Sequence, residues 1–189
     1  MSSHAKSLDV VLAFVLAVSC VHAADPAAPG GVLAPASALP SPGPVMSKLT
    51  KMSHQWGVPT GWRTEVIPFP LDFAPSLPYQ GLEELRFSPD FGKADRPLFF
   101  TYAFVWAIKG DQPPSVEQLS KDMKVYFDGL MIAVAKSSKI PNAVIDTKVE
   151  LQPDTVARER VQGDPWTLLA TGSIWTYDSF FTKKSLQLD

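Results

Sequence analysis

Residues 98–138 read LFFTYAFVWAIKGDQPPSVEQLSKDMKVYFDGLMIAVAKSS, and this segment predicts one strand followed by one helix. Within residues 98–108 the large side chains share one parity: Leu98, Phe100, Tyr102, Phe104, Trp106 and Ile108. The other parity carries mostly smaller residues. A period of two with apolar side chains on both faces predicts a central, largely buried strand.

A helix follows after a short loop. Ser115, with Gln118 three residues later, has the pattern of a capping box at a helix start. The apolar residues that follow recur at helical spacing: Val116, Leu119, Met123, Tyr126, Phe127, Leu130 and Val134. We expect this face to pack on the large-residue face of the strand, with Phe104 against Leu130 or Met123.

Alternating patterns predict further strands on both sides of this segment. They fall at residues 61–69 and 82–87 before it, and at residues 143–151, 155–162, 166–177 and 182–188 after it. Short turns separate the first three of the later strands, as in an antiparallel meander. The fold class predicted is therefore α+β, with one long amphipathic helix packed on a curved antiparallel β-sheet.

Composition limits the partners. The chain has 189 residues, 46% of them hydrophobic, and a formal charge of −2. Such a chain buries a core, but it offers no basic field that would attract nucleic acid. We expect a small ligand or an envelope component as partner, and the sequence leaves the oligomeric state open.

Residues 1–23 have the three parts of an export signal. A polar start carries Lys6, residues 10–19 are an apolar run, and Ala23 ends a small-residue cleavage pattern. An apolar run of ten is too short to span a bilayer, which needs roughly 20 residues. We therefore expect export to the periplasm or outside the cell, and no transmembrane helix.

Cys20, the single cysteine, leaves two forms of the mature protein open. Residues 17–20, AVSC, resemble a degenerate bacterial lipobox, which would make Cys20 a lipidated first residue. The alternative is simple cleavage after Ala23. In both cases the folded part has no cysteine, which excludes disulfides and cysteine-ligated metals there.

The remaining chain divides into a tether and one domain. Residues 24–55 are rich in alanine, proline and glycine in their first two thirds and predict an extended tether. Residues 56–189 predict a single α+β domain. Its last strand-like segment is either a true terminal edge strand or the point where a longer chain is truncated.

Few residues in this domain suit catalysis. His54 is the only histidine beyond the signal and lies at the tether boundary, so no histidine triad or multi-histidine metal site is expected. Phosphate-binding loops and nucleophile elbows are absent from the sequence. We expect no metal and no cofactor.

The densest polar set in an apolar setting offers the catalytic alternative. It consists of Glu65, Asp72, Glu83, Glu84 and Arg86, which belong to the first two predicted strands and the loop between them. Two carboxylates with different pKa values could act as acid and base. Adjacent Glu83 and Glu84 point to opposite faces of a strand, however, so only one can face the core. A buried glutamate held by Arg86 or by loop amides is the structural interpretation.

Aromatic residues offer the binding alternative. Trp62 lies near the start of a predicted strand and Trp166 directly follows a Gly-Asp-Pro turn, so both are candidates for partly exposed ligand-binding plates. Trp106 and Trp175 lie within predicted strands, and we expect them to pack in the core.

Three segments in order, EVIPFPLDFAP (65–75), GLEELRF (81–87) and YAFVW (102–106), resemble an uncharacterised group of exported bacterial proteins. The resemblance covers the chain from Trp62 to its end. It implies export and transfers no active site.

Two functional hypotheses follow. The first is an exported or envelope-associated, non-catalytic binding domain. The second is a carboxylate-dependent enzyme of hydrolase or isomerase type that uses Asp72 and either Glu83 or Glu84.

Overall fold

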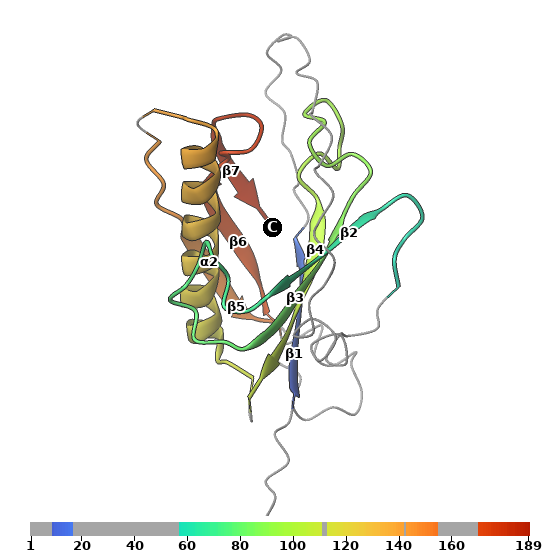
Figure 1. Cartoon of the computed structure of the whole chain (residues 1–189), viewed down its shortest axis with the longest axis vertical. Helices are drawn as coiled ribbons and strands as arrows, with labels where there is room; N and C mark the ends of the chain where they lie inside the picture. The colour runs from blue at the N-terminus through green and yellow to red at the C-terminus, as the bar shows by residue number, and fades with distance from the viewer. Residues whose placement is uncertain (1–8, 17–56, 111–112, 142, 155–169) are drawn as a thin grey trace, which may run out of the picture.

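The computed structural model describes residues 9–16, 57–110, 113–141, 143–154 and 170–189. Its elements in chain order are β1 (Asp9–Leu16), β2 (Arg63–Pro68), β3 (Gly81–Phe87), β4 (Tyr102–Lys109), α2 (Val116–Ser137), β5 (Lys148–Pro153), β6 (Ala170–Tyr177) and β7 (Ser185–Leu188) (Figure 1). The fold is α+β, with one 22-residue helix packed on antiparallel sheets. The predicted fold class is thus confirmed at this level.

The strands form two sheets where the sequence predicted one. A four-stranded sheet has the order β1-β4-β3-β2, and a three-stranded sheet has the order β5-β6-β7 (Figure 1). The strand predicted at residues 155–162 lies outside the described residues, and β5 pairs directly with β6. Helix α2 lies between β4 and β5 in the chain and contacts β5 and β6 of the second sheet.

Strand β4 occupies the interior of the larger sheet, as its pattern predicted. It begins at Tyr102, and a turn occupies residues 97–100 before it. Every side chain from Tyr102 to Ile108 is buried. Neighbouring β3 is aligned so that Glu83 lies opposite Trp106 and Leu85 opposite Phe104. These residues share the sheet face that receives the helix.

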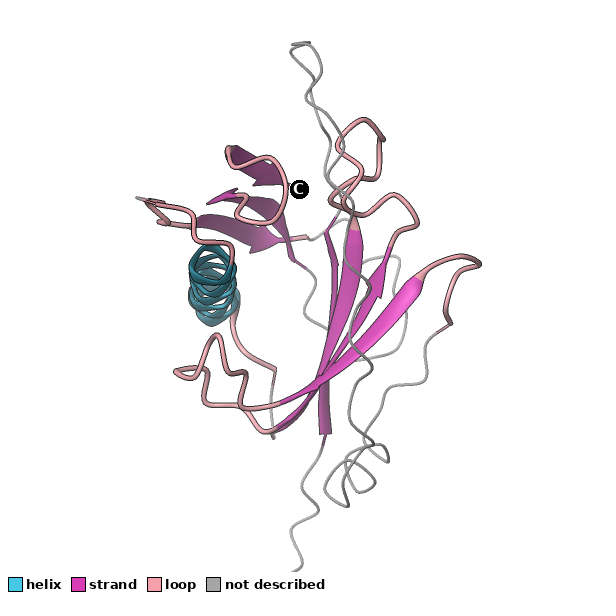
Figure 2. Ribbon diagram, turned by 45° about the horizontal axis from the view of Figure 1, so that its top comes forward, coloured by secondary structure: helices cyan, strands magenta, loops and turns pink. Residues whose placement is uncertain are grey.

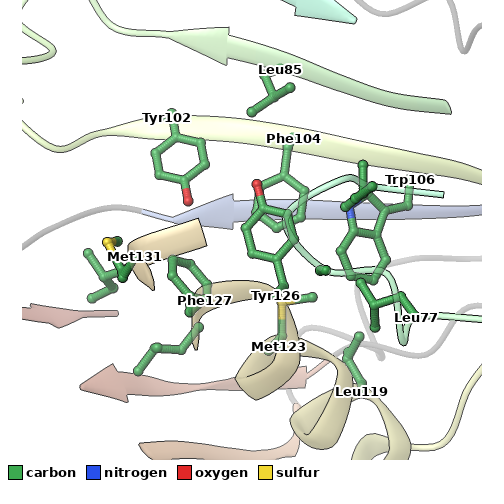
Figure 3. Packing of buried hydrophobic residues seen from close by; sticks show 14 of the residues in the cluster. Leu77, Leu85, Tyr102, Phe104, Trp106, Leu119, Met123, Tyr126, Phe127 and Met131 are labelled. Atoms are coloured by element: carbon green, nitrogen blue, oxygen red, sulfur yellow. The ribbon is translucent and has the colours of Figure 1, made fainter. Parts of the chain in front are cut away.

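Helix α2 begins as the capping pattern predicted. The Ser115 hydroxyl accepts a hydrogen bond from the Gln118 backbone N–H at 3.2 Å. The buried stripe of the helix differs from the predicted one at its C-terminal end: Met131 and Ala135 are buried, whereas Leu130 is only partly so. The prediction that Phe104 packs against this stripe holds, but its ring stacks on Tyr126, at 5.4 Å between centroids and 8° between planes (Figure 3).

The core lies between the two sheets and the helix. Figure 2 shows α2 close to end-on, beside the β5-β6-β7 sheet and facing the larger sheet. One cluster of buried apolar residues draws on all of these elements, including Trp106 from β4, Phe127 from α2 and Ile174 from β6. The turn between β6 and β7 contributes as well, because Phe181 contacts Phe91 of the loop that precedes β4, at 5.3 Å between ring centroids.

The loop between β2 and β3, residues 69–80, closes one side of this core. Its Phe73 ring contacts Tyr126 at 5.2 Å, and its Tyr79 hydroxyl donates a hydrogen bond to the Asp122 carboxylate on α2. Gly129 makes this approach possible, since a Cβ there would lie 2.0 Å from the Phe73 carbonyl oxygen. The helix and the loop therefore meet backbone to backbone.

Residues 9–16, part of the predicted export signal, form strand β1. They pair antiparallel with β4 along the full eight residues of each strand. The proposed cleavage at Cys20 or Ala23 would remove this strand from the mature chain.

Gly129→Ala tests the contact between the helix and the loop. Alanine normally stabilises a helix interior by about 1 kcal/mol over glycine, but here the new methyl group must displace the Phe73 carbonyl. We expect the free energy of unfolding, measured by urea titration, to fall by about 1–3 kcal/mol. Ala133→Gly, at an exposed position of the same helix, is the control and should cost about 1 kcal/mol. A stabilised Gly129→Ala variant would contradict the close approach.

Candidate functional site

Glu83 is the titratable group that the fold places most unusually. Strand β3 directs it, with Leu85 and Phe87, toward the helix side of the sheet, and its side chain is 0% exposed. The indole Nε1 of Trp106 on the neighbouring strand donates a hydrogen bond to Glu83 Oε1 at 3.1 Å. A carboxyl group is therefore fixed within the aromatic core.

The surroundings of Glu83 favour its neutral form. Burial raises the pKa of its carboxyl from 4.5 to about 7, and the charge of Glu65 acts in the same direction. The hydroxyl of Tyr126 and the indole of Trp106 oppose this rise by stabilising the carboxylate. Near neutral pH, Glu83 is thus divided between two protonation states.

Two tyrosines complete this polar cluster. Burial, together with the negative charge of Glu83, raises the pKa of Tyr102 and of Tyr126 well above the ordinary value. Within the described part of the chain, no hydrogen bond of good geometry reaches Glu83 Oε2 or the Tyr102 hydroxyl, although the Tyr126 hydroxyl interacts with both side chains. Figure 3 shows Tyr102, Tyr126 and Trp106 together in the core. The cluster is a buried, incompletely satisfied polar group.

Glu84 and Arg86 lie on the opposite face of β3, as the period of a strand predicted. Both are buried, and Arg86 Nη2 lies 3.5 Å from Glu84 Oε2. Arg86 also donates a hydrogen bond through Nη1 to the Leu85 carbonyl oxygen at 2.9 Å. Arg86 therefore pairs with Glu84 and lies across the sheet from Glu83.

Asp72 is exposed on the loop of residues 69–80, whereas Glu83 is fully buried. Glu84 lies across the sheet from Glu83. The structure therefore brings no two of these three predicted carboxylates together at a solvent-connected site. A general acid and base acting on one substrate need such an arrangement.

The aromatic candidates fall in different places. Trp62 is partly exposed just before β2, whereas Trp166, Cys20 and His54 lie outside the described residues. Trp106 is fully buried, which confirms its predicted packing role. Trp175 was expected in the core as well, but it is partly exposed. Side chains alternate between the two faces along β6, so Ile174 and Thr176 take the buried inner face and Trp175 takes the outer one.

Trp175 belongs to a polar surface that the sequence reasoning missed, the outer face of the β5-β6-β7 sheet. Lys148, Trp175 and Gln187 are aligned across its three strands. The Lys148 Nζ lies 5.0 Å from the Trp175 ring centroid, and the Trp175 indole donates to Gln187 Oε1 at 3.1 Å. Beside this row, the Ser173 hydroxyl donates to Asp189 Oδ1 at 2.5 Å.

One sequence signal could have revealed this surface. Residues 170–177 alternate, so Ile174 and Trp175 must face opposite sides of their strand. Choosing the apolar, β-branched Ile174 for the core would have turned Trp175 outward. The grouping of Tyr102 and Tyr126 around Glu83 had no comparable local signal, because it joins three separate elements.

The described residues hold no group of three histidine, cysteine, aspartate or glutamate side chains that could bind a metal ion. No helix among them is long and apolar enough to cross a membrane. Comparisons with family models, curated proteins and solved structures found no match for this chain.

Glu83→Gln tests the environment of the buried carboxyl. Because the folded-state pKa is raised to about 7, the folded protein binds more protons than the unfolded chain between about pH 4.5 and pH 7. Stability should therefore fall as pH rises through this range, by roughly 3 kcal/mol at about 1.4 kcal/mol per pKa unit. Urea titrations across this range should show a flatter pH dependence for Glu83→Gln.

Asp95→Asn, at an exposed loop position, is the matched control and should keep the pH dependence of the parent protein. An unchanged pH dependence in Glu83→Gln would show that Glu83 titrates at the same pH in the folded and unfolded chains.

Proposed function

We propose that this chain is an exported or envelope-associated domain that binds a ligand or an envelope component and does not catalyse a reaction. It would act in the periplasm or outside the cell, either free after cleavage at Ala23 or anchored by a lipid at Cys20. The resemblance to exported proteins in residues 65–106 and the signal-like residues 1–23 support export.

The separation of the carboxylates is the observation that carries the non-catalytic part of this proposal. Glu83 is enclosed by aromatic side chains, Glu84 pairs with Arg86 on the other face, and Asp72 is exposed elsewhere. Each carboxylate has a separate environment. Acid and base catalysis on one substrate is therefore disfavoured by geometry.

Two partly exposed tryptophans support binding. Trp175 presents its ring beside lysine, glutamine, serine and aspartate side chains on the outer face of the β5-β6-β7 sheet. Trp62 precedes the exposed strand β2 at the edge of the other sheet. An aromatic surface flanked by hydrogen-bonding groups suits a ligand that has both an apolar face and hydroxyl groups, as a sugar does.

One observation favours the alternative, a carboxylate-dependent hydrolase or isomerase using Asp72 and Glu83 or Glu84. The pKa of Glu83, about 7, is the value that a general acid or base needs near neutral pH. Such an enzyme would have to open the core to bring substrate to Glu83. The enzyme hypothesis predicts catalytic turnover that Glu83→Gln abolishes. The binding hypothesis predicts no turnover.

A thermal-shift screen of the exported protein tests the binding function. A ligand that binds only the folded state raises the melting temperature, and one present at 100 times its Kd stabilises by about 2.7 kcal/mol. We expect a shift with at least one class among sugars, lipids and peptides. Trp175→Ala or Trp62→Ala should remove the shift and leave the melting temperature without ligand nearly unchanged.

Val144→Ala, at a side chain that is 83% exposed, is the control and should leave the ligand shift intact. A screen in which no class shifts the melting temperature would contradict a binding role. Loss of the shift in the control variant as well would contradict the assignment of the two tryptophans.

Export is tested by the N-terminus of the protein made in a bacterium from the full sequence. We expect mass spectrometry of the exported fraction to find Ala24, or an acylated Cys20, as the first residue. Acylation would also move the protein into a detergent phase. Recovery of the chain only from the cytoplasm, with Met1 intact, would contradict export.

A further inference from the structure

The edge strands of this fold differ in how they are protected. A strand at a sheet edge presents unpaired backbone N–H and C=O groups to other chains, and proteins guard such edges with charged residues, proline or short strands. In the described part of the chain, β1 and β2 edge the larger sheet, and β5 and β7 edge the smaller one. Strand β1 carries one charge, Asp9, at its first residue, whereas β2, β5 and β7 each carry such a guard.

The protective residues can be read from the sequences of β2, β5 and β7. Strand β2 contains Arg63, Glu65 and Pro68 and is largely exposed. Strand β5 contains Lys148, Glu150 and Pro153. Strand β7 is only four residues long. These strands therefore have the features of strands that end a sheet in solvent.

Strand β4 has none of these features before its last residue. From Tyr102 to Ile108 it contains no charge and no proline, and all seven side chains are buried. Its composition is that of an interior strand. It is an interior strand here because β1 pairs with it along all eight residues.

Strand β1 comes from the segment that export would remove. Processing after Ala23, or at Cys20, takes away residues 9–16 and leaves β4 with β3 as its one partner among the described strands. An apolar, unguarded strand of eight residues would then edge the sheet. This step rests on the proposed export.

We propose that, in the exported protein, the freed edge of β4 pairs antiparallel with β4 of a second copy of this chain. The larger sheets of two copies would then join as one continuous sheet through a two-fold axis between the two β4 strands. Pairing along a sheet edge is an established mode of association, and a two-fold axis satisfies both edges at once.

Three features favour a second copy. The pairing of β1 shows that this edge accepts an antiparallel strand along its whole length. Antiparallel pairing of two β4 strands places the two Lys109 side chains, the only charges in them, at opposite ends of the ribbon. Within the tether, residues 24–44 carry six prolines, which lack the N–H that a strand needs.

The experiment compares two forms of the same protein. One is the exported form, purified after processing, with its N-terminus read by mass spectrometry. The other is the intact chain of 189 residues, made by cell-free translation without membranes so that β1 is retained. Light scattering coupled to size-exclusion chromatography, in detergent if Cys20 is acylated, gives the mass of each. Amide hydrogen exchange of residues 102–109 reports whether β4 has a partner on its free edge.

We expect the exported form to be a dimer and the intact chain to be a monomer, with slow exchange along β4 in both. Dilution of the exported form to monomer should accelerate exchange at about half of the β4 amides, those that point away from β3. A dimer of the intact chain as well would overturn the proposal, because β1 would already occupy the edge.

Three other results would overturn it. An exported monomer with slow exchange along β4 would mean that residues of the same chain cover the edge. An exported monomer with fast exchange, or an unfolded exported form, would mean that no second copy supplies the strand. If the chain is never processed, only the export proposal fails. Cleavage of the intact chain at a protease site introduced after residue 23 then tests the β4 edge separately.

Discussion

The stacking of Phe104 on Tyr126 joins the central strand to the helix, and the arrangement of the core depends on it. The two rings lie 5.4 Å apart and nearly parallel, and both side chains are fully enclosed. Because β4 is flanked by β3 in fixed register, seating Phe104 on the helix also places Trp106 and Glu83 in the same layer. The loop of residues 69–80 then covers this layer through Phe69, whose ring meets Trp106 at 5.5 Å.

This arrangement buries the Glu83 carboxyl group, which is energetically unfavourable. A carboxyl group in an apolar core loses its hydration, and the Trp106 indole and the Tyr126 hydroxyl, which stabilise the carboxylate, replace only part of it. The protein accommodates the group by raising its pKa, which makes the neutral form available near pH 7. A buried acid of this kind is compatible with a proton-transfer role. Here its complete enclosure makes a structural role the simpler account.

Two surfaces at the periphery of the fold are the candidates for binding. The outer face of the β5-β6-β7 sheet combines the Trp175 ring with charged and amide side chains, whereas its inner face is buried against α2. In the proposed exported form, the edge of β4 that β1 occupies would instead offer backbone hydrogen bonds. The two proposed surfaces would suit different partners, a small amphipathic ligand in the first case and another strand in the second.

Local sequence patterns were sufficient to predict the features that depend on neighbouring residues: the cap at Ser115, the period of β4 and α2, the opposite orientation of Glu83 and Glu84, and hence the α+β class. Which residues meet in the core became known from the three-dimensional arrangement. In the folded chain Met131 is buried where Leu130 was expected, and the strands form two sheets. Trp175 points outward, and aromatic rings from other elements surround Glu83. The reason is that local spacing fixes which face a side chain takes, whereas strand order and register fix what that face contacts. The bond between Glu83 and Trp106 joins residues 23 positions apart, a separation that no local pattern encodes.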